Sequence, residues 1–216
     1  MTSNLRGPNY SESDMAVINM RDKTLECKLV YYGPGRGGKT TNLEFIHKAG
    51  KKYTTSDMVS IKTKGDRTLY FDFLPIGIGK IKGYDVKVQL YTVPGQAKYN
   101  STRKMVLKNV DGIVFVADSF KIRRKANILS LKNLQENLAE QEMNIFDIPM
   151  VIQFNKRDLA DEGVPVMPLE QMEKELNCRL KAPTFEASAL RGKGVGDSLK
   201  KCLLLTLKKL QKEIKN

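Results

Sequence analysis

Features typical of membrane and secreted proteins are missing from this sequence. Its apolar runs, such as "GIVFVAD" and "CLLLTL", are far shorter than the roughly 18 to 20 residues that cross a bilayer as a helix. The opening stretch "MTSNLRGPNYSESD" contains no apolar core of the kind that a signal peptide carries. We therefore expect a cytoplasmic protein.

Paired cysteines and internal repeats are missing as well. Cys27, Cys178 and Cys202 stand far apart without C-x-x-C spacing, so we expect reduced core thiols and neither a zinc site nor disulfides. The chain has 216 residues, of which 41% are hydrophobic, and this is enough to bury the core of one domain. We expect that domain over residues 25–216, with residues 1–24 as a candidate flexible N-terminal appendage.

Acidic residues are scarce relative to basic ones. The chain has 24 Asp and Glu against 37 Lys and Arg, a formal net charge of +13, which favours an anionic partner. The basic residues gather in "KAGKKY", "KIRRK" and residues 200–215, and they lack the interleaved aromatic residues of a single-strand-binding surface. We expect no nucleic acid partner. Weak association of the last helix with an acidic membrane surface is left open.

Strand and helix patterns alternate along the chain. We expect strands at residues 25–32, 67–76, 84–93, 111–119, 149–155 and 184–187, and helices between or after them. The second and third of these strands are joined by the turn-rich "GIGKIKG", which is the spacing of a hairpin. The pattern predicts an α/β fold with a mostly parallel central sheet, one antiparallel edge strand and helices on both faces.

The stretch "GPGRGGKT" fits the phosphate-binding pattern G-x-x-x-x-G-K-[ST] and lies between a predicted strand and a predicted helix. A loop with few Cβ atoms can turn successive N–H groups onto phosphate oxygens, and the helix N-terminus adds its positive dipole. We expect Lys39 to reach the β- and γ-phosphates, Thr40 to ligate Mg²⁺ and Thr41 to contact the α-phosphate. The predicted phosphate-binding residues are Gly33, Gly35, Arg36, Gly37, Gly38, Lys39, Thr40 and Thr41.

A second motif selects the base. Asn155, Lys156 and Asp158 form an N-K-x-D sequence at the end of a predicted buried strand. The Asp158 carboxylate can accept both the N1–H and the exocyclic amine of guanine, and adenine lacks this pair of donors. Lys156 would lie along the base plane. Ser188, Ala189 and Leu190 follow the last predicted strand, where the Ala189 N–H could donate to guanine O6. The motif therefore predicts GTP or GDP as the ligand.

A third segment, "YTVPGQAKY", lies between a predicted strand and a polar helix. The N–H of Gly95 is placed to sense a γ-phosphate, and Gln96 could orient an attacking water. Taken alone, Pro94 and Gly95 would be read as an ordinary turn. Their position between the two other motifs favours a role in hydrolysis.

In these segments the sequence resembles the small Ras-like GTPases, and within them the bacterial MglA type of motility and polarity switch. The resemblance covers about residues 25–212 and rests on "YYGPGRGGKTTNL", "DRTLYFDFLP", "YTVPGQ", "VDGIVFVADS" and "VIQFNKRDL", in the family's order. It implies a P-loop small GTPase fold and slow hydrolysis of GTP. The usual D-x-x-G is here Thr92-Val93-Pro94-Gly95, as in MglA, and Asp72 either replaces the missing acid near Mg²⁺ or is a structural residue at a strand end.

The resemblance also implies two residues of the switch that responds to nucleotide. Thr68 would complete the Mg²⁺ shell, and Arg67 would act as an arginine finger supplied by the chain itself. Residues 51–66 are polar and turn-rich, so we expect them to let Arg67 move. A Roadblock-type GTPase-activating protein, as a dimer, is the implied partner, and a cell pole or the inner membrane surface is the implied location.

Two functions of different classes remain open. In the first, GTP and Mg²⁺ order the switch segments and hydrolysis releases them, so that effectors read an on state and an off state. In the second, the chain is a binding module that acts through its basic surface, with a nucleotide that only stabilises the fold. Turnover of GTP distinguishes the two.

Overall fold

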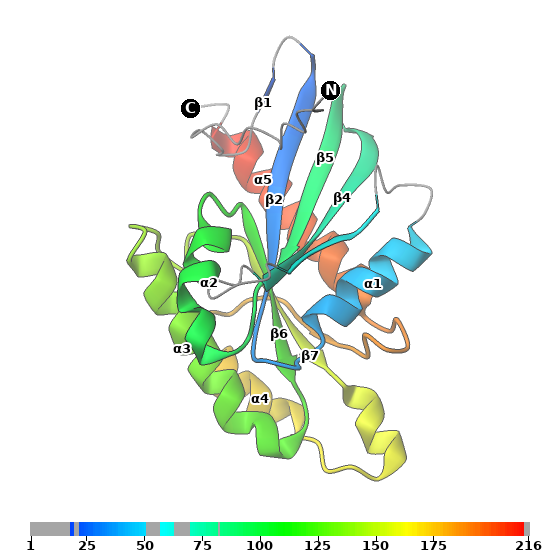
Figure 1. Ribbon diagram of the computed structural model, residues 1–216, viewed down its shortest axis with the longest axis vertical. Coiled ribbons are helices and arrows are strands. Elements are labelled where there is room, and N and C mark those ends of the chain that lie inside the picture. Colours follow the sequence, from blue (N-terminus) through cyan, green and yellow to red (C-terminus); the bar gives the residue numbers. More distant parts are fainter. Residues whose placement is uncertain (1–17, 20–21, 51–56, 63–69, 82, 214–216) are drawn as a thin grey trace, which may run out of the picture.

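A computed structural model describes residues 18–19, 22–50, 57–62, 70–81 and 83–213. These residues form one eight-stranded sheet in the order β3-β4-β5-β2-β6-β7-β8, with β1 paired to β2 (Figure 1). The strands are β1 (Ile18–Asn19), β2 (Thr24–Tyr32), β3 (Val59–Lys62), β4 (Tyr70–Ile81), β5 (Tyr84–Thr92), β6 (Gly112–Asp118), β7 (Met150–Asn155) and β8 (Thr184–Glu186). The strands β5, β2, β6, β7 and β8 run parallel.

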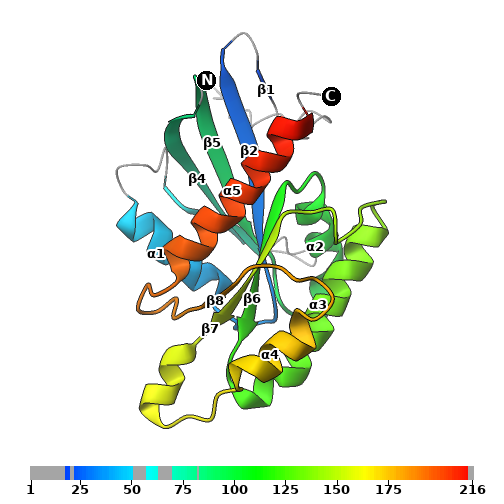
Figure 2. The same cartoon turned by 180° about the vertical axis from the view of Figure 1, so that it is seen from behind.

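Helices cover both faces of the sheet (Figures 1 and 2). The helices are α1 (Lys39–Ala49), α2 (Asn100–Leu107), α3 (Arg124–Ala139), α4 (Leu169–Leu176) and α5 (Val195–Glu213). Short 3₁₀ turns precede or join them at η1 (Ala97–Tyr99), η2 (Lys121–Arg123) and η3 (Arg157–Glu162). One hydrophobic cluster lies under α1 and α5, and the other lies under α2, α3 and α4.

The alternation of side chains along β2 explains the two clusters. Leu29 and Tyr31 belong to the cluster under α1 and α5, whereas Val30 and Tyr32 belong to the cluster under α2 to α4. Successive residues of a strand point to opposite faces, so a strand covered on both sides is apolar at every position. All seven residues of β6 are buried for the same reason.

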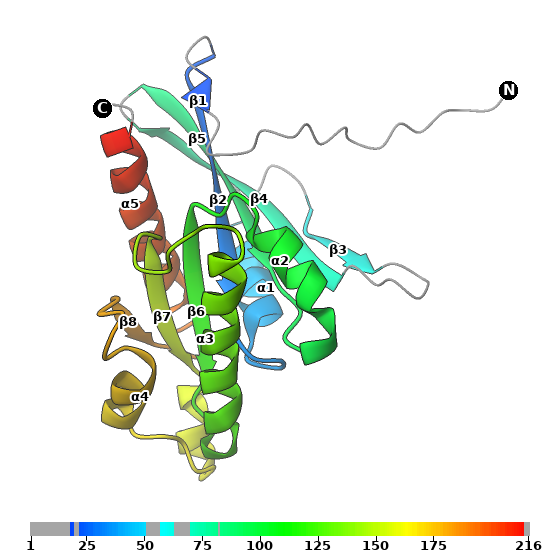
Figure 3. The same cartoon turned by 90° about the vertical axis from the view of Figure 1, so that its left-hand side faces the viewer.

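The predicted mostly parallel sheet is confirmed, and two details of the prediction are wrong. The antiparallel strand β4 is not an edge strand, because β3 pairs antiparallel with its outer side (Figure 3). The predicted turn at residues 77–83 is largely strand. The β4–β5 pairing continues to Ile81 and Tyr84 across a register shift between Gly77 and Lys80, since a bulge absorbs the glycine-rich sequence.

Two short strands lie in segments for which no strand was predicted. β3 falls within the polar segment at residues 51–66, and β1 falls within the expected appendage and pairs antiparallel with the start of β2. Cys27 and Cys202 are buried as expected, but Cys178 is exposed because it follows α4 on the surface. In the part of the chain that the structure describes, no helix is both long and apolar enough to cross a membrane.

Candidate nucleotide-binding and active site

The predicted phosphate-binding residues, Gly95, Gln96 and Lys156 line a cleft of about 1290 Å³ beside the carboxyl ends of β2, β5 and β6. Ligands of open α/β sheets bind at this edge. The loop from β2 to α1 contributes residues 33–41, the segment after β5 contributes residues 92–96, and Lys156 comes from the end of β7. Three segments that are far apart in sequence therefore line one cavity, as the motifs predicted.

The loop between β2 and α1 is organised around Lys39. Its Nζ donates to the carbonyls of Gly33 at 3.0 Å and Pro34 at 2.7 Å, and the side chain is only 6% exposed. Burial is the largest of the causes that together lower the pKa of Lys39 to about 7; the neighbouring cations Arg103 and Arg123 also lower it, and Asp72 opposes them. An anion beside Lys39 would offset these effects and favour its charged form.

The phosphate-binding loop and the N-K-x-D motif are fastened to each other by Asn155. Its Nδ2 donates to the carbonyl of Gly37 at 2.8 Å, and its Oδ1 accepts from the N–H of Ala189 at 2.8 Å. Gly38 has a φ of 97°, and a Cβ there would lie 2.2 Å from Asn155 Nδ2, so only glycine fits. The Ala189 N–H already has a partner within the protein, so a contact with guanine O6 would need it to share or exchange that bond.

The Asp158 carboxylate is nearly buried and unpaired. Asp158 is the second residue of the turn η3, three residues after β7 ends at Asn155, and it is 8% exposed. Within the described ranges, no side chain or backbone group donates a hydrogen bond to its carboxylate, and no cation pairs with it. Its oxygens are not among the fully buried polar atoms of the described residues that lack a partner, so they reach solvent and are available to accept from a ligand.

Lys156 is held in the cleft by a residue that the sequence did not single out. Its Nζ donates to Asp118 Oδ2 at 2.7 Å, and Asp118, the last residue of β6, is fully buried. The Lys156 backbone takes a left-handed φ of 67°, which turns the chain from β7 into η3. The side chain is thereby fixed along the wall that leads from the phosphate loop to Asp158.

Asp72 contacts Thr92, the residue that stands at the acid position of the D-x-x-G motif. Its Oδ2 accepts from the hydroxyl of Thr40 at 2.6 Å and from the hydroxyl of Thr92 at 2.9 Å. Thr92 occupies the place of the acid on β5, and Asp72 delivers a carboxylate to the same point from the adjacent strand β4. Hydroxyl and carboxylate oxygens are the ligands that Mg²⁺ prefers.

The few protein oxygens at the start of α1 are enough for an Mg²⁺ ion that binds together with a nucleotide. In the residues that the structure covers, no group of three or more His, Cys, Asp and Glu side chains could hold a metal. Mg²⁺ in nucleotide sites is held by one or two protein oxygens together with phosphates and water, and does not need a full protein cage. Thr40 and Asp72 can supply that small number of oxygens.

The segment after β5 is fastened by the buried side chain of Arg103 on α2. Its Nη1 donates to the carbonyl of Gln96 at 2.6 Å and to that of Pro94 at 3.1 Å. The Gln96 side chain is exposed and borders the cleft, so it can reach a reacting group there. Gly95 packs so closely on the phosphate loop that a Cβ would lie 2.1 Å from Gly35 N.

Some predicted site residues are not brought into the cleft. Arg67 and Thr68 lie outside the described residues. Asp158 and residues 188–190 lie beyond Lys156 and do not line the cavity, although Ala189 lies against Gly38. Leu190 is 76% exposed and Ser188 is buried.

Three residues of the site were not predicted from the sequence: Arg103 and Arg123, which line the cleft, and Asp118, which is buried behind it. Arg103 is buried and donates to the carbonyl of Pro94. Asp118 is buried and accepts from Lys156. Arg123 is half-buried and donates to the carbonyl of Gly35. Arg103 and Arg123 stand among many basic residues, and their charge alone does not show which of them is buried. An acid at the carboxyl end of a buried strand was a usable signal for Asp118, because such ends meet at the ligand edge.

The order in which these segments reach the cleft is that of a P-loop GTPase. A strand leads through the phosphate loop into α1, the next parallel strand leads to Gly95 and Gln96, and a third parallel strand ends in N-K-x-D.

Comparisons with known proteins agree with this class. Residues 14–205 match the ADP-ribosylation factor family. The chain is 48% identical over 198 residues to the mutual gliding-motility protein MglA of Myxococcus xanthus, an alignment that covers 92% of this chain and 99% of that protein. It is 26% identical over 189 residues to the Ras-related protein Rab-27B of Rattus norvegicus, covering 86% and 81% of the two chains. The chain therefore belongs to the ADP-ribosylation factor family and is a small GTPase.

Proposed function

We propose that the cleft binds GTP and GDP with Mg²⁺ and that GTP hydrolysis here drives a switch in bacterial motility or cell polarity. The unpaired, nearly buried carboxylate of Asp158 carries the assignment of the base, because guanine offers two adjacent donors that satisfy it. Lys39 provides the counter-charge for the phosphates. Its buried ammonium is surrounded by further cations, which favours a polyphosphate over a neutral ligand.

The proposed Mg²⁺ site is formed by Thr40, Asp72 and Thr68. Thr40 donates its hydroxyl hydrogen to Asp72, which leaves the Thr40 oxygen lone pairs available to a cation. Mg²⁺ would neutralise charge on the β- and γ-phosphates. The Asp72 carboxylate compensates for the threonine that replaces the usual acid, as its bond to Thr92 indicates.

Hydrolysis is assigned to Gln96 and Arg67. Gln96 lies at the cleft on a segment whose backbone Arg103 holds, and its exposed side chain is free to orient a water. Arg67 is assigned by family resemblance as the arginine finger. An exposed side chain is not held in place before the transition state, so unassisted turnover should be slow.

We further propose that a regulator accelerates this turnover and that effector proteins distinguish the GTP-bound from the GDP-bound state. The relative from Myxococcus is a gliding-motility protein, and this supports a motility or polarity process for the present chain. By the same resemblance the regulator is a dimeric Roadblock-type activating protein, and the location is a cell pole or the inner membrane surface. The basic face of the last helix, which carries the exposed Lys200, Lys201, Lys208 and Lys212, would favour weak contact with acidic lipid.

Changing Asp158 to asparagine should weaken guanine-nucleotide binding by about 10² to 10⁴-fold, because two charge-assisted hydrogen bonds of roughly 1.5 to 3 kcal/mol each are lost. Competition between GDP and a fluorescent GDP analogue measures the effect. Asp161→Asn is the matched control, since Asp161 lies on the same turn, is exposed and pairs with Arg191. Equal affinity in parent and Asp158→Asn would rule out this role.

Changing Asp72 to asparagine should reduce the gain in GDP affinity that Mg²⁺ provides, by about tenfold. Asparagine keeps the shape and one acceptor for Thr40 and Thr92 but removes the negative charge. The comparison is GDP dissociation with Mg²⁺ against dissociation with a chelator, and Asp85→Asn, an exposed acid on β5, is the control. The same Mg²⁺ dependence in Asp72→Asn as in the parent would show that the carboxylate has only a structural role.

A further inference from the structure

Arg123 is a cation in the cleft, and the residues assigned above to hydrolysis do not include it. It is the last residue of η2, the short turn between β6 and α3, and it borders the cavity beside the phosphate loop. Its Nη2 donates to the backbone carbonyl of Gly35 at 2.6 Å. The contact joins two segments 88 residues apart and acts on the middle of the phosphate-binding loop.

The guanidinium is anchored from behind by Asp118. Arg123 Nε lies 3.7 Å from Asp118 Oδ2, and the same oxygen accepts from Lys156 Nζ at 2.7 Å. The Asp118 backbone is bonded at both its N–H and its carbonyl to the side chain of Asn127 on α3. One fixed, fully buried carboxylate therefore accepts a hydrogen bond from Lys156 and forms an ion pair with Arg123, whose Nε has no hydrogen-bond partner among the described residues.

The bond to Gly35 also orients the next N–H of the loop. Every described peptide bond is trans, so the carbonyl of Gly35 and the N–H of Arg36, which share one peptide plane, point in opposite directions. Because the Arg123 guanidinium binds the Gly35 carbonyl, the Arg36 N–H faces away from Arg123. A charged donor on a carbonyl also polarises the peptide and strengthens the N–H on its other side as a donor.

We propose that Arg123 is a positioning residue for GTP: anchored by Asp118, it fixes the Gly35–Arg36 peptide so that the Arg36 N–H faces the phosphates. The inference rests on the proposed GTP site. It extends to hydrolysis because Gly95 packs directly on Gly35, with a Cβ at Gly95 lying 2.1 Å from Gly35 N and 2.3 Å from Gly35 Cα. A loosened Gly35 would release Gly95 and the adjacent Gln96 as well.

The test compares Arg123→Ala and Arg123→Lys with Arg124→Ala. Arg124 is the matched control because it is the next residue, is exposed and pairs with Glu175 away from the cleft. Two rates are measured for each full-length variant: dissociation of fluorescent GDP and GTP analogues, and single-turnover hydrolysis at saturating GTP with the activator absent. Thermal melting of the GDP complex reports whether each variant is folded.

Arg123→Ala should release both nucleotides about tenfold faster and hydrolyse bound GTP about tenfold more slowly than the parent, while Arg124→Ala matches the parent. Arg123→Lys should recover only part of both rates, since one ammonium cannot contact Gly35 and Asp118 together as a planar fork does. Added guanidinium ion should speed hydrolysis by Arg123→Ala and leave the parent unchanged, a response that loss of packing alone would not give.

Rates for Arg123→Ala within twofold of those for Arg124→Ala would overturn the proposal. If Arg123→Ala does not fold, Arg123→Lys decides: hydrolysis at least threefold below the parent supports the proposal, and parental rates overturn it. Failure of the parent itself to bind GDP would instead contradict the proposed GTP site, so the two failures are distinguishable.

Discussion

Replacing Lys39 with alanine should abolish tight nucleotide binding, with a loss of GDP and GTP affinity of about 10² to 10⁴-fold. Lys39 is 6% exposed and is the residue of the phosphate-binding pattern that reaches the β- and γ-phosphates. Two charge-assisted hydrogen bonds to phosphate, of roughly 1.5 to 3 kcal/mol each, would be lost. The variant also loses the bonds from Nζ to the carbonyls of Gly33 and Pro34, so the loop would be less well ordered.

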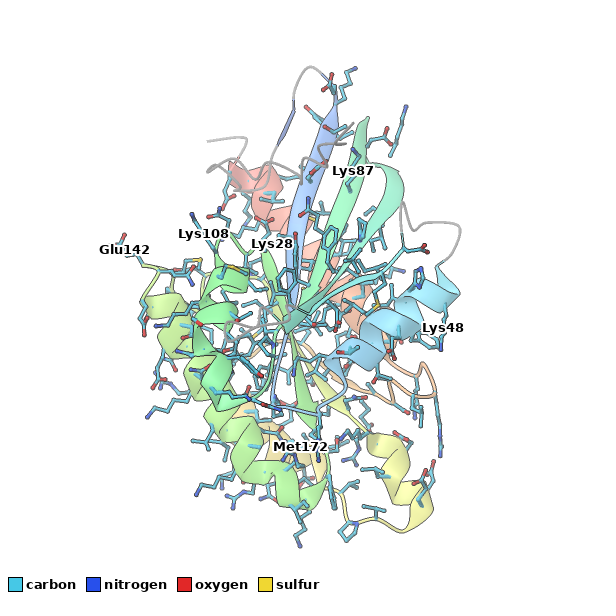
Figure 4. All side chains as sticks on the ribbon, in the orientation of Figure 1. Lys28, Lys48, Lys87, Lys108, Glu142 and Met172 are labelled. Carbon is cyan, nitrogen blue, oxygen red and sulfur yellow. The ribbon has the colours of Figure 1, made fainter. Side chains whose placement is uncertain are left out.

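Titration of a fluorescent GDP analogue in the presence of Mg²⁺ measures this loss. Lys48→Ala is the control, because Lys48 is exposed and lies at the end of α1 remote from the phosphate loop (Figure 4). Melting of both variants without nucleotide shows whether the fold is retained. Sub-micromolar affinity in a folded Lys39→Ala protein would mean that the loop is not the phosphate site.

Gln96→Leu should bind GTP nearly as well as the parent and yet resist activation by the regulator. Leucine fills a similar volume but cannot orient a water, and the Gln96 carbonyl that Arg103 holds is unchanged. Single-turnover hydrolysis with and without the regulator measures the response. Lys98→Ala, which changes an exposed neighbour on η1, should respond as the parent does. A full response by Gln96→Leu would exclude the assigned role.

Arg67→Ala should show the largest loss of stimulated turnover, because an arginine finger is worth on the order of 10³ to 10⁵ in rate. Affinity for GTP should stay close to that of the parent, which leaves the switch locked in its on state. The same single-turnover assay, with the regulator titrated, measures the stimulated turnover and the affinity for GTP. An essential arginine in the regulator itself would contradict the mechanism in which the chain supplies its own.

Much of the fold could be predicted because the pattern of apolar residues in a strand indicates which of its faces are buried. The run "GIVFVAD" is buried at every position and apolar up to its last residue, Asp118, since helices cover both faces of β6. β3 and the end of β4 could not be predicted in this way. β3 has only four residues, Val59–Lys62, in a polar segment, and it is a strand because it pairs with β4. Local propensity carries little information about such pairing.

Some residues of the site could be predicted from the sequence and others could not. Lys39, Thr40, Asn155 and Asp158 could be predicted because phosphate and guanine recognition need particular residue types at a fixed spacing. Asp72 became a definite candidate only when β4 was seen to place its carboxylate 2.6 Å from the Thr40 hydroxyl. No spacing rule links residues on two strands that are brought together by an antiparallel pairing.

Arg103, Asp118 and Arg123 were missed for a different physical reason. None of them is part of a ligand-binding pattern, since each acts on another residue of the protein and that partner is 7, 38 or 88 residues away. In a chain with 37 basic residues, the buried Arg103 and the half-buried Arg123 cannot be distinguished by composition from solvated ones. Their burial and their partners are properties of the folded cleft.

The central claim is that this chain is a guanine-nucleotide switch, and the nucleotide that the purified protein carries tests it most directly. The protein is freed of excess nucleotide by gel filtration in Mg²⁺, denatured, and its released small molecules are identified by mass spectrometry. We expect guanine nucleotide, mostly GDP in the parent and a raised share of GTP in Gln96→Leu. Release of an adenine nucleotide, or of none from a protein that also fails to take up added GTP, would contradict it.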